Sequence, residues 1–446
     1  MRHTSLPIVL LIWLSAHLLS AQAPSNIYHI LSHEQEALQC RWGLISQASG
    51  EICLSTYAIK DDLIGLATMQ LLIKAAERGV SVKLLLDDFD NGLPDCLLTY
   101  LEERGVHTKV FNIMNPFKLR TLVDRMHGKM LITDQRTLLV GGRNLAARYY
   151  LLDPAGNFLD REVYVVADSA VHHAYQHFEV LWNNPNLSGR KYAGLTQEQR
   201  DCWKEALEKA PEIVQKKLQL PPIGQKSWET GFRNTNQPIQ FIHDNFTYDQ
   251  RRKGLKWRRR KDRQATYELI ELVSKAKTAI DLENPYFLPT KRWRRGLKKC
   301  LDQGVRIRLL TNSSYTNDVP LIQAIYLNRR ARVLRSGIEI WEYRGPKMLH
   351  TKAIVIDRHI SAIGSYNLEK LSHMYNSEVM VWVDDPLIAA EHARLMQEVL
   401  KSSDHVGKQH KPFRHTHPTP TKIERKRHRK VQFLRFTLAP LVGIFL

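Results

Sequence analysis

In the first part of the chain, stretches whose hydrophobic pattern is typical of a strand alternate with stretches whose hydrophobic pattern is typical of a helix. Residues 51–59 form a β-rich run, and residues 65–78 then place apolar side chains at helical spacing. In residues 78–88, Gly79 is expected to end this helix, and an almost unbroken apolar strand follows, of the kind buried on both faces. Residues 93–104 predict another helix and residues 106–113 another strand. These patterns predict an α/β unit of alternating strands and helices.

The same order of patterns returns in the second part of the chain. The runs RGVSVKLLL and QGVRIRLLT hold corresponding places in the two parts. A repeat of this size predicts a duplicated α/β domain. The later helices are expected at 265–276, 292–301 and 318–336, and the later strands at 278–287, 303–313 and 337–343.

Composition shifts set the expected domain boundaries. A chain of 446 residues is longer than one core usually organises. We predict an N-terminal domain at 24–195 and a C-terminal domain at 264–405. Between them, residues 196–263 are polar and end in the basic run RRKGLKWRRRKDR, so they are predicted to connect the domains or to form a structured insertion. Residues 406–446 form a basic tail with a short apolar end, and residues 408–430 of this tail are not expected to pack a core.

The first residues have the order of a secretory signal. Arg2 supplies a basic start, residues 6–19 are apolar, and Ala21 and Ala23 are small residues of the kind found at a cleavage site. An uncleaved membrane anchor is the alternative, but this apolar run is shorter than the roughly 20 residues that span a bilayer. We expect residues 1–23 to be a cleaved signal peptide and the protein to be periplasmic or secreted.

The net charge indicates the kind of partner. A formal charge of +20 predicts a polyanion, either nucleic acid or a membrane rich in acidic lipid. Basic clusters beside aromatic or apolar residues, around Trp257 and Trp293 and near the end of the chain, favour an anionic membrane surface. Nucleic acid is the less favoured partner, and the oligomeric state stays open. Five cysteines without a C-x-x-C spacing argue against a zinc or redox site.

Two stretches repeat one motif: HGKMLITDQRTLLVGGRNL and HTKAIVIDRHISAIGSYNL. One H-x-K-x4-D match arises by chance in about one chain in ten or twenty of this length. Two copies with matching Gly and Asn residues downstream are not explained by chance. The shared positions are His127, Lys129, Asp134, Gly141 and Asn144 in the first copy, and His350, Lys352, Asp357, Gly364 and Asn367 in the second.

The residue types of the motif suit a phosphodiester. Residues two apart on a strand project from one face, so each His lies beside its Lys. An imidazole can attack phosphorus while the ammonium group neutralises the phosphate oxygens, and an Asn amide adds a donor without charge. One copy alone would also be explained by polar positions on an exposed strand. Duplication of a fold would keep only its apolar pattern, so the shared polar residues favour a phosphodiester site.

The two motifs resemble the paired HKD motifs of the phospholipase D superfamily, and the resemblance covers residues 35–400. The stretches LLDD, NPYFLP and LTNSSYTNDVPLIQAIY are similar to bacterial cardiolipin synthases, especially the cardiolipin synthase C type. The resemblance implies two phospholipase D-like domains, each a mixed β-sheet flanked by helices, with the active site at their interface. It implies an enzyme that uses no metal and no cofactor, because ammonium and amide groups carry the developing charge.

The resemblance also implies roles for the motif residues. One His attacks phosphorus to form a phosphohistidine, and the other protonates the leaving alcohol and then deprotonates the incoming one. We expect His127 to be the nucleophile and His350 the general acid and base. Asp134 and Asp357 belong to the catalytic motif but are expected to tie down loops rather than to carry protons. The phosphate oxygens would be held by Lys129, Lys352, Asn144 and Asn367.

Members of the superfamily carry an acidic residue after each Asn that orients a His. The candidates here are Asp160 and Glu378, with Glu162 as a rival for Asp160. The first motif has GGRN where the second has GSYN, so only Ser365 supplies a hydroxyl there, and we include it among the substrate-binding candidates.

Several activities fit these residues. The favoured one is a phosphatidyltransferase, similar to cardiolipin synthase, that acts on phospholipid at a membrane. The same chemistry with water as the acceptor would be that of a phospholipase D that releases phosphatidic acid. A secreted, metal-independent endonuclease is a further alternative, and a member that binds lipid without turnover is the non-enzymatic one. The sequence does not identify the donor lipid or the acceptor alcohol.

Overall fold

The structure is a computed structural model that describes residues 26–113, 117, 123–184, 187, 194–224, 229, 231–245, 262–407 and 419–443. The predicted signal peptide, most of the basic run RRKGLKWRRRKDR and the first part of the predicted tail lie outside these residues.

The first half of the chain forms an eight-stranded mixed sheet in the order β4-β3-β2-β5-β6-β8-β1-β9. Strands β2, β3 and β4 are parallel and are joined by helices, whereas β5, β6 and β8 are antiparallel. The strands are β1 (Asn26–Leu31), β2 (Glu51–Thr56), β3 (Ser81–Asp87), β4 (Val106–Phe111), β5 (Met130–Thr133), β6 (Thr137–Gly141), β8 (Glu162–Val166) and β9 (Asn234–Thr235).

The second half repeats this arrangement in a sheet of order β10-β17-β16-β15-β11-β12-β13-β18. Its parallel strands β11, β12 and β13 correspond to β2, β3 and β4, so the predicted duplicated α/β fold is confirmed. The strands are β10 (Ile239–His243), β11 (Ala279–Glu283), β12 (Arg306–Asn312), β13 (Glu339–Tyr343), β15 (Ala353–Ile356), β16 (Ile360–Gly364), β17 (Val379–Asp384) and β18 (Ser403–Val406).

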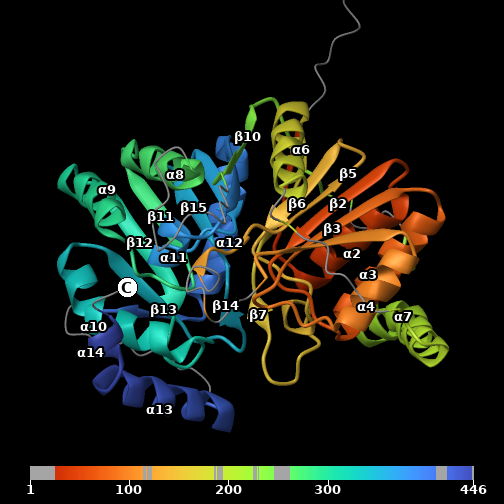
Figure 1. Cartoon of the computed structure of the whole chain (residues 1–446). Helices are drawn as coiled ribbons and strands as arrows, with labels where there is room; N and C mark the ends of the chain where they lie inside the picture. Colours follow the sequence, from red (N-terminus) through yellow and green to blue (C-terminus); the bar gives the residue numbers. More distant parts are fainter. Residues whose placement is uncertain are drawn as a thin grey trace, which may run out of the picture.

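The two sheets lie side by side and share a central core (Figure 1). Helices α6 (Asp168–Trp182) and α12 (Pro386–Leu400) pack between them, and their buried side chains form one hydrophobic cluster with β5, β6, β8, β15, β16 and β17. The outer face of the first sheet is covered by α2 (Glu34–Gln47), α3 (Leu63–Glu77) and α4 (Asp95–Glu103). The outer face of the second is covered by α8 (Gln264–Ser274), α9 (Lys291–Asp302) and α10 (Pro320–Arg335).

This layering explains the unbroken apolar strands. Leu54 and Leu84 face the outer core of the first half, whereas Cys53 and Leu85 face the shared core. Because both faces of β2 and β3 are covered, neither strand keeps the alternation of polar and apolar residues that a half-exposed strand shows.

The segment predicted to connect the domains contributes to both of them. Helix α7 (Gln197–Leu218) packs on α3 and buries Leu207 and Val214 in the outer core of the first half. Strand β9 pairs with β1 of the first sheet, and β10 pairs with β17 of the second. The second sheet therefore begins within the predicted connecting segment. The sequence did not predict β9 and β10, because strands this short carry too little of an alternating pattern.

The second part of the tail is helical and packs on the second half. Helices α13 (Lys422–Phe436) and α14 (Ala439–Val442) lie on α10, and Val431 and Ala439 are buried in the outer core of the second half. Both buried residues lie beyond 408–430, the stretch that was expected not to pack a core. No helix within the described part of the chain is long and apolar enough to cross a membrane.

Candidate active site

Both motifs open into one cavity of about 560 Å³ between the two halves. His127, Asn144, His350 and Asn367 all line it. The His of each motif lies just before the first antiparallel strand of its sheet. This strand is β5 in the first half and β15 in the second. Other lining residues come from both halves and include Tyr57, Phe89, Arg148, Tyr149, Phe158, Tyr286, Asp318 and Glu369.

The backbone of each motif is hydrogen-bonded to the opposite half. The N–H groups of His127 and Gly128 both donate to the carbonyl of Ser377, at 3.0 Å each, and the N–H of Ser377 donates to the carbonyl of Arg125 at 2.7 Å. In the same way, β14 (Met348–Leu349) pairs in parallel with β7 (Phe158–Leu159), and the N–H of His350 donates to the carbonyl of Leu159 at 2.8 Å. Each His is therefore placed by backbone of the other half.

The carboxylates that hold the two imidazoles are also exchanged between the halves. Nδ1 of His127 lies 2.9 Å from Oε2 of Glu378, and Nδ1 of His350 lies 2.6 Å from Oδ2 of Asp160. Glu162, the rival of Asp160, forms an ion pair with Arg41 instead. With Nδ1 occupied in this way, Nε2 of each ring is the nitrogen that remains for chemistry.

Burial sets the charge states of these pairs. Burial lowers the pKa of His127 to about 4, although Glu378 acts to raise it. Burial, together with the ammonium of Lys352, also lowers the pKa of His350. Burial acts to raise the pKa of Glu378, but His127 and Lys129 bring it below its usual value. Each pair is therefore a neutral imidazole whose Nδ1–H donates to a charged carboxylate.

Asp160 is charged for a similar reason. Burial raises its pKa, but Lys352 and His350 outweigh burial and lower the value overall. Lys352 Nζ lies 3.8 Å from Oδ2 of Asp160, so the ammonium and carboxylate are close enough to compensate each other inside the protein.

The two motif lysines are buried, and each donates to the backbone carbonyl of its own His, but Lys352 also lies beside the imidazole. Lys129 donates to the carbonyl of His127 at 2.5 Å, and its Nζ lies over the ring of Tyr57. Lys352 Nζ lies 2.7 Å from Nδ1 and 3.1 Å from Nε2 of His350. Burial lowers the pKa of Lys129 to about 7 and lowers that of Lys352 as well. An anionic phosphate in the cavity would favour the charged form of both lysines.

The two motif asparagines line the cavity with different amide environments. Asn144 donates to the hydroxyl of Tyr149 at 2.9 Å and accepts from the N–H of Ala58 at 3.2 Å. The buried side-chain oxygen of Asn367 has no hydrogen-bond partner among the described residues. A substrate hydroxyl or another donor would satisfy this oxygen.

The remaining predicted residues lie outside the cavity. The carboxylate of Asp134 accepts the N–H groups of Gly50 and Glu51 at 2.7 and 3.0 Å. Asp357 accepts the N–H groups of Thr278 and Ala279 at 2.7 and 2.9 Å. Each motif Asp therefore ties the loop before β2 or β11 to the sheet, far from a proton-transfer position at either imidazole.

Ser365 does not occupy the substrate-binding position that the sequence suggested. Its side chain is fully buried, and its hydroxyl donates to Oε2 of Glu378 at 2.5 Å. Ser365 therefore holds the carboxylate that orients His127, and it contacts the reaction only through that carboxylate.

Sequence reasoning missed several residues of the cavity. The ring of His127 packs edge-on against Tyr57 at 5.0 Å, and the ring of His350 stacks on Phe158 at 4.9 Å. Tyr286 donates to Asp318 at 2.6 Å. Burial, with the nearby charge of Glu378, raises the pKa of Glu369 to about 8, which leaves a protonated carboxyl at neutral pH. Two of these residues stood within quoted stretches, since Tyr286 is part of NPYFLP and Asp318 is part of LTNSSYTNDVPLIQAIY.

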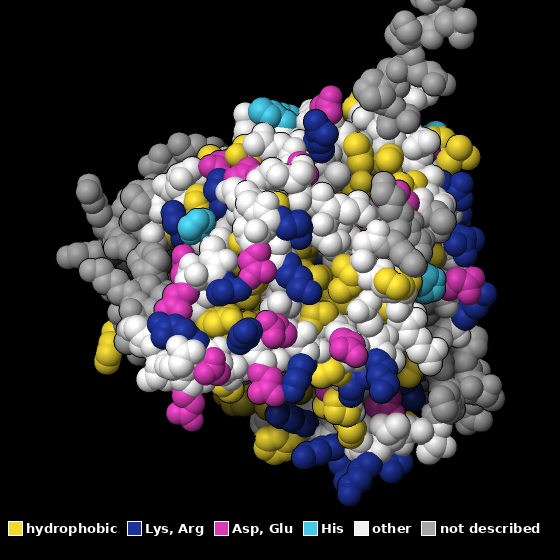
Figure 2. Space-filling view, turned by 90° about the vertical axis from the view of Figure 1, so that its right-hand side faces the viewer, with side chains coloured by type: hydrophobic (Ala, Val, Ile, Leu, Met, Phe, Trp, Pro, Cys, Tyr) yellow, Lys and Arg dark blue, Asp and Glu magenta, His cyan; other side chains and the backbone are white. Residues whose placement is uncertain are grey.

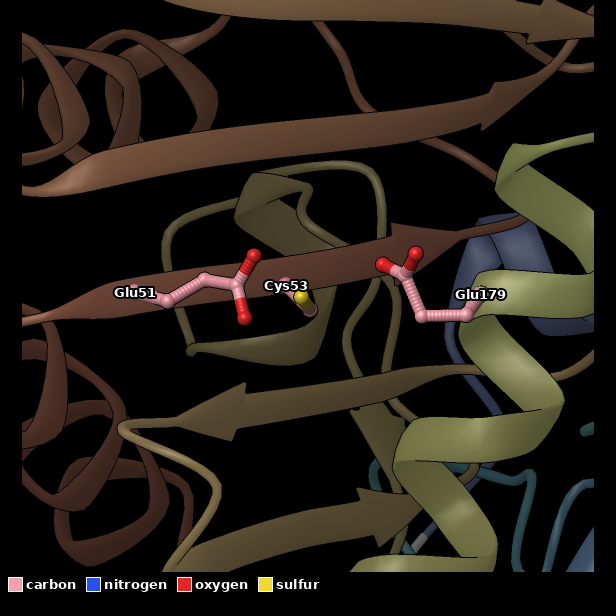
Figure 3. A group of neighbouring side chains, drawn as sticks. All are labelled: Glu51, Cys53 and Glu179. Atoms are coloured by element: carbon pink, nitrogen blue, oxygen red, sulfur yellow. The ribbon is translucent and has the colours of Figure 1, made fainter.

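One group of metal-ligand type lies elsewhere. Glu51 and Cys53 on β2 and Glu179 on α6 point toward one another (Figure 3). Lys83 Nζ bridges the two carboxylates at 2.8 and 2.7 Å, so an ammonium group already compensates their charge. No other such group is present in the described part of the chain.

The chain is similar to several known proteins. The family model described as cardiolipin synthase, PLD-like domain matches residues 42–182 and 269–400. Cardiolipin synthase C of Escherichia coli is 25% identical over 80% of this chain and 81% of its own. Cardiolipin synthase B of Escherichia coli is 25% identical over 81% and 77%. The crystal structure of a phosphatidylserine synthase from Haemophilus influenzae shares the fold, with a TM-score of 0.66 and 14% identity over 96% of this chain and 97% of that one.

Proposed function

The chain belongs to the family described as cardiolipin synthase, PLD-like domain, and from this premise we propose a specific reaction for it. Membership confirms the expectation of an enzyme of the phospholipase D superfamily. We propose that the enzyme transfers a phosphatidyl group from a phospholipid to an acceptor alcohol through a covalent phosphohistidine. The observation that carries the proposal is the pair of neutral imidazoles in one cavity, each held at Nδ1 by a buried carboxylate.

In the first step, Nε2 of His127 attacks phosphorus and the bond from phosphorus to the leaving alcohol oxygen breaks. His350, protonated at Nε2 in the presence of the anionic phosphodiester and Asp160, gives its proton to that oxygen. In the second step, the acceptor alcohol gives its proton to Nε2 of His350 while its oxygen attacks phosphorus, and the bond from phosphorus to His127 breaks. Both imidazoles then regain their starting states.

A difference between the imidazoles supports this division of roles. Lys352 lies within 3.1 Å of Nε2 of His350, which keeps a proton donor beside that ring. No hydrogen bond to Nε2 of His127 is present within the described ranges, and Lys129 shares with Lys352 only the contact with the backbone carbonyl of its own His. A nitrogen with a free lone pair is the better nucleophile.

The surroundings of the phosphate support the same chemistry. Lys129, Lys352 and the amides of Asn144 and Asn367 lie at the two motifs, where negative charge develops on the phosphate oxygens. Their burial strengthens electrostatic stabilisation of the transition state. We further propose that the protein is exported and works at an anionic membrane surface, which would present the phospholipid to the cavity.

The test uses the purified protein with mixed vesicles of phosphatidylglycerol and phosphatidylethanolamine, with products resolved by mass. Cardiolipin formed by the parent and lost in His127→Ala is the expected result. The exposed His107→Ala is the matched control and should behave as the parent does. If phosphatidic acid forms without cardiolipin, the enzyme is a hydrolase and not a transferase. Unchanged lipid together with cleavage of added DNA would overturn the assignment of a phospholipid substrate.

A further inference from the structure

The outward face of α13, continued by α14, has no role in the reaction described above. We propose that this face, which we call the α13 face, is the surface by which the enzyme lies on an anionic bilayer. The α13 face comprises Lys422, Arg425, Lys426, Arg429, Lys430, Phe433, Phe436, Leu438 and Leu441. The inference rests on the proposed function only in its expectation of a phospholipid substrate.

The inner side of α13 is fixed to the second half. The imidazole of His428 lies 2.7 Å from the hydroxyl of Ser314 and stacks on Tyr315 with ring centroids 4.4 Å apart. Arg427 donates to the carbonyl of Tyr315 at 2.8 Å, and Val431 is fully buried. These contacts set the rotation of the helix about its axis, so the opposite side must face outward.

The cations of the α13 face are not compensated by neighbouring acids. The only acidic residue of α13 is Glu424, whose side chain accepts the N–H of Thr421 in a capping box. None of the five exposed Lys and Arg residues of this face forms an ion pair within the residues that the structure describes. An uncompensated row of this kind is attracted to acidic lipid headgroups.

The apolar residues of the same face are exposed to an unusual degree. Phe433 is 66% exposed, Phe436 75% and Leu441 65%. Lys422, Lys426 and Arg429 precede these aromatics at intervals of three or four residues, which places the cations and both Phe residues along one side of the helix. Cations followed by aromatic and aliphatic side chains on one helix side are typical of helices that lie in a membrane interface.

The α13 face differs in charge from most of the flank shown in Figure 2. On the flank shown in Figure 2, basic and acidic side chains are interspersed over most of the view, and Lys and Arg predominate at the lower edge. That edge is the one along which α13 lies in Figure 1, since the two views differ by a turn about the vertical axis. Interspersed charge keeps a surface soluble without attracting one kind of partner.

The inner side of α13 lies near the reaction cavity. Tyr315, which contacts α13, begins the loop that leads to Asp318 in the lining of the cavity. A second hollow of about 510 Å³ separates Ile423 and Arg427 from residues 154–157 and 344–348, which precede β7 and β14. A bilayer seated on α13 would therefore hold lipid headgroups close to the strands that carry His350.

Nucleic acid is a weaker match for this face. Phosphate backbones would attract the same cations. Leu438 and Leu441, however, have neither the charge nor the flat ring that a nucleic acid strand uses, whereas the acyl region of a bilayer accepts both. The observations therefore favour the lipid surface.

The test measures cosedimentation of the full chain with vesicles of phosphatidylglycerol and phosphatidylcholine, compared with phosphatidylcholine alone. Two double variants address the two parts of the face: Lys426→Glu with Arg429→Glu, and Phe433→Ser with Phe436→Ser. The control is Lys204→Glu with Lys216→Glu, which makes the same charge change on the exposed side of α7. Thermal unfolding of each variant at the parental temperature establishes that it is folded.

The parent should bind anionic vesicles, and each α13 variant should lose about tenfold or more of that binding while the α7 control keeps it. Equal binding by parent and both α13 variants, or tighter binding of the parent to duplex DNA than to vesicles, would overturn the docking surface. Turnover of detergent-dispersed phospholipid is measured in parallel and should be unchanged in the α13 variants. Absent turnover with intact α13-dependent binding would reject the proposed reaction and leave the docking surface standing.

Discussion

His127 and His350 hold corresponding places in the two halves, but the carboxylates that hold them have different surroundings. Besides His127, Glu378 is held by Ser365 and Ser372, which donate at 2.5 and 2.6 Å. Asp160, in contrast, lies beside the ammonium of Lys352 and accepts the N–H of Arg161. The comparison suggests that neutral hydrogen bonds fix the first imidazole, whereas charge dominates around the second.

The same comparison explains why one motif reads GGRN and the other GSYN. A Cβ atom on Gly142 would lie 2.3 and 2.5 Å from the carboxylate oxygens of Asp160, so no side chain fits there. At the matching position of the second motif, the longer acid Glu378 leaves room for Ser365 and uses its hydroxyl. The length of the acid and the size of the motif residue therefore vary together.

The largest expected effect comes from the imidazoles themselves. Either His→Ala change should lower turnover of phospholipid by about 10⁴-fold or more, because each removes a group that forms or breaks a bond. The changes should differ with a substrate whose leaving group is a nitrophenol, which needs no proton. His350→Ala should still form a trapped covalent adduct there, and His127→Ala should not. The exposed His359→Ala serves as the control, and adduct formation by His127→Ala alone would reverse the roles.

The carboxylates provide the next test. Asp160→Asn should lower kcat by about 10²-fold, since the amide keeps the shape but no longer balances the imidazolium of His350 and Lys352. The decrease in kcat caused by Glu378→Gln should be about tenfold smaller than that caused by Asp160→Asn, because Ser365 and Ser372 still hold the side chain. Steady-state kinetics at saturating lipid measures both values. A larger loss in Glu378→Gln would contradict the division into charge and hydrogen bonding.

A matched pair of alanines tests the fit around each acid. Gly142→Ala should lower the free energy of unfolding by about 3 kcal/mol, because the new methyl group meets Asp160. Ser365→Ala should cost about 1–2 kcal/mol, since it removes a buried hydrogen bond without adding volume. Urea unfolding at pH 7 gives both values. Equal costs would mean that Asp160 can move away from the motif.

The smallest expected effect concerns Glu369, whose counterpart in the first half is Ala146. Burial raises the pKa of Glu369 from 4.5 to about 8, so between these values the folded protein holds a proton that the unfolded chain has lost. The stability contributed by this group is therefore greatest below pH 4.5 and falls as the pH rises toward 8. Glu369→Gln should remove this pH dependence of the free energy of unfolding. The dependence itself amounts to at most about 1.4 kcal/mol per pH unit.

Urea unfolding of Glu369→Gln and of the parent at pH 5 and pH 8 checks this prediction. The exposed Glu208→Gln on α7 should follow the parent at both values. A difference between Glu369→Gln and the parent that does not change with pH would mean that the carboxyl of Glu369 stays ionised in the folded protein.

Local patterns were sufficient to predict the duplicated fold and the two motifs that meet in the cavity. Periodicity located the parallel strands, because their burial on both faces leaves long apolar runs, and the repeated motif located both imidazoles. The exchange of acids between the halves could not be predicted, since it depends on how two sheets pack and not on either sequence stretch. The burial of Glu369 and the docking of α13 depend on the same long-range packing, which a single sequence does not encode in any local pattern.

The exchange of Glu378 and Asp160 has a consequence for the ancestry of such a chain. Each half carries an imidazole that it cannot orient by itself, and each supplies the acid that its neighbour needs. A lone ancestral half would have lacked the acid that orients its imidazole. A second copy related by two-fold symmetry would have supplied that acid, and both imidazoles would then have met in one cavity. The present chain corresponds to such a dimer joined end to end. Its two halves differ in one respect: one has a glycine against a short acid, and the other has a serine that holds a longer one.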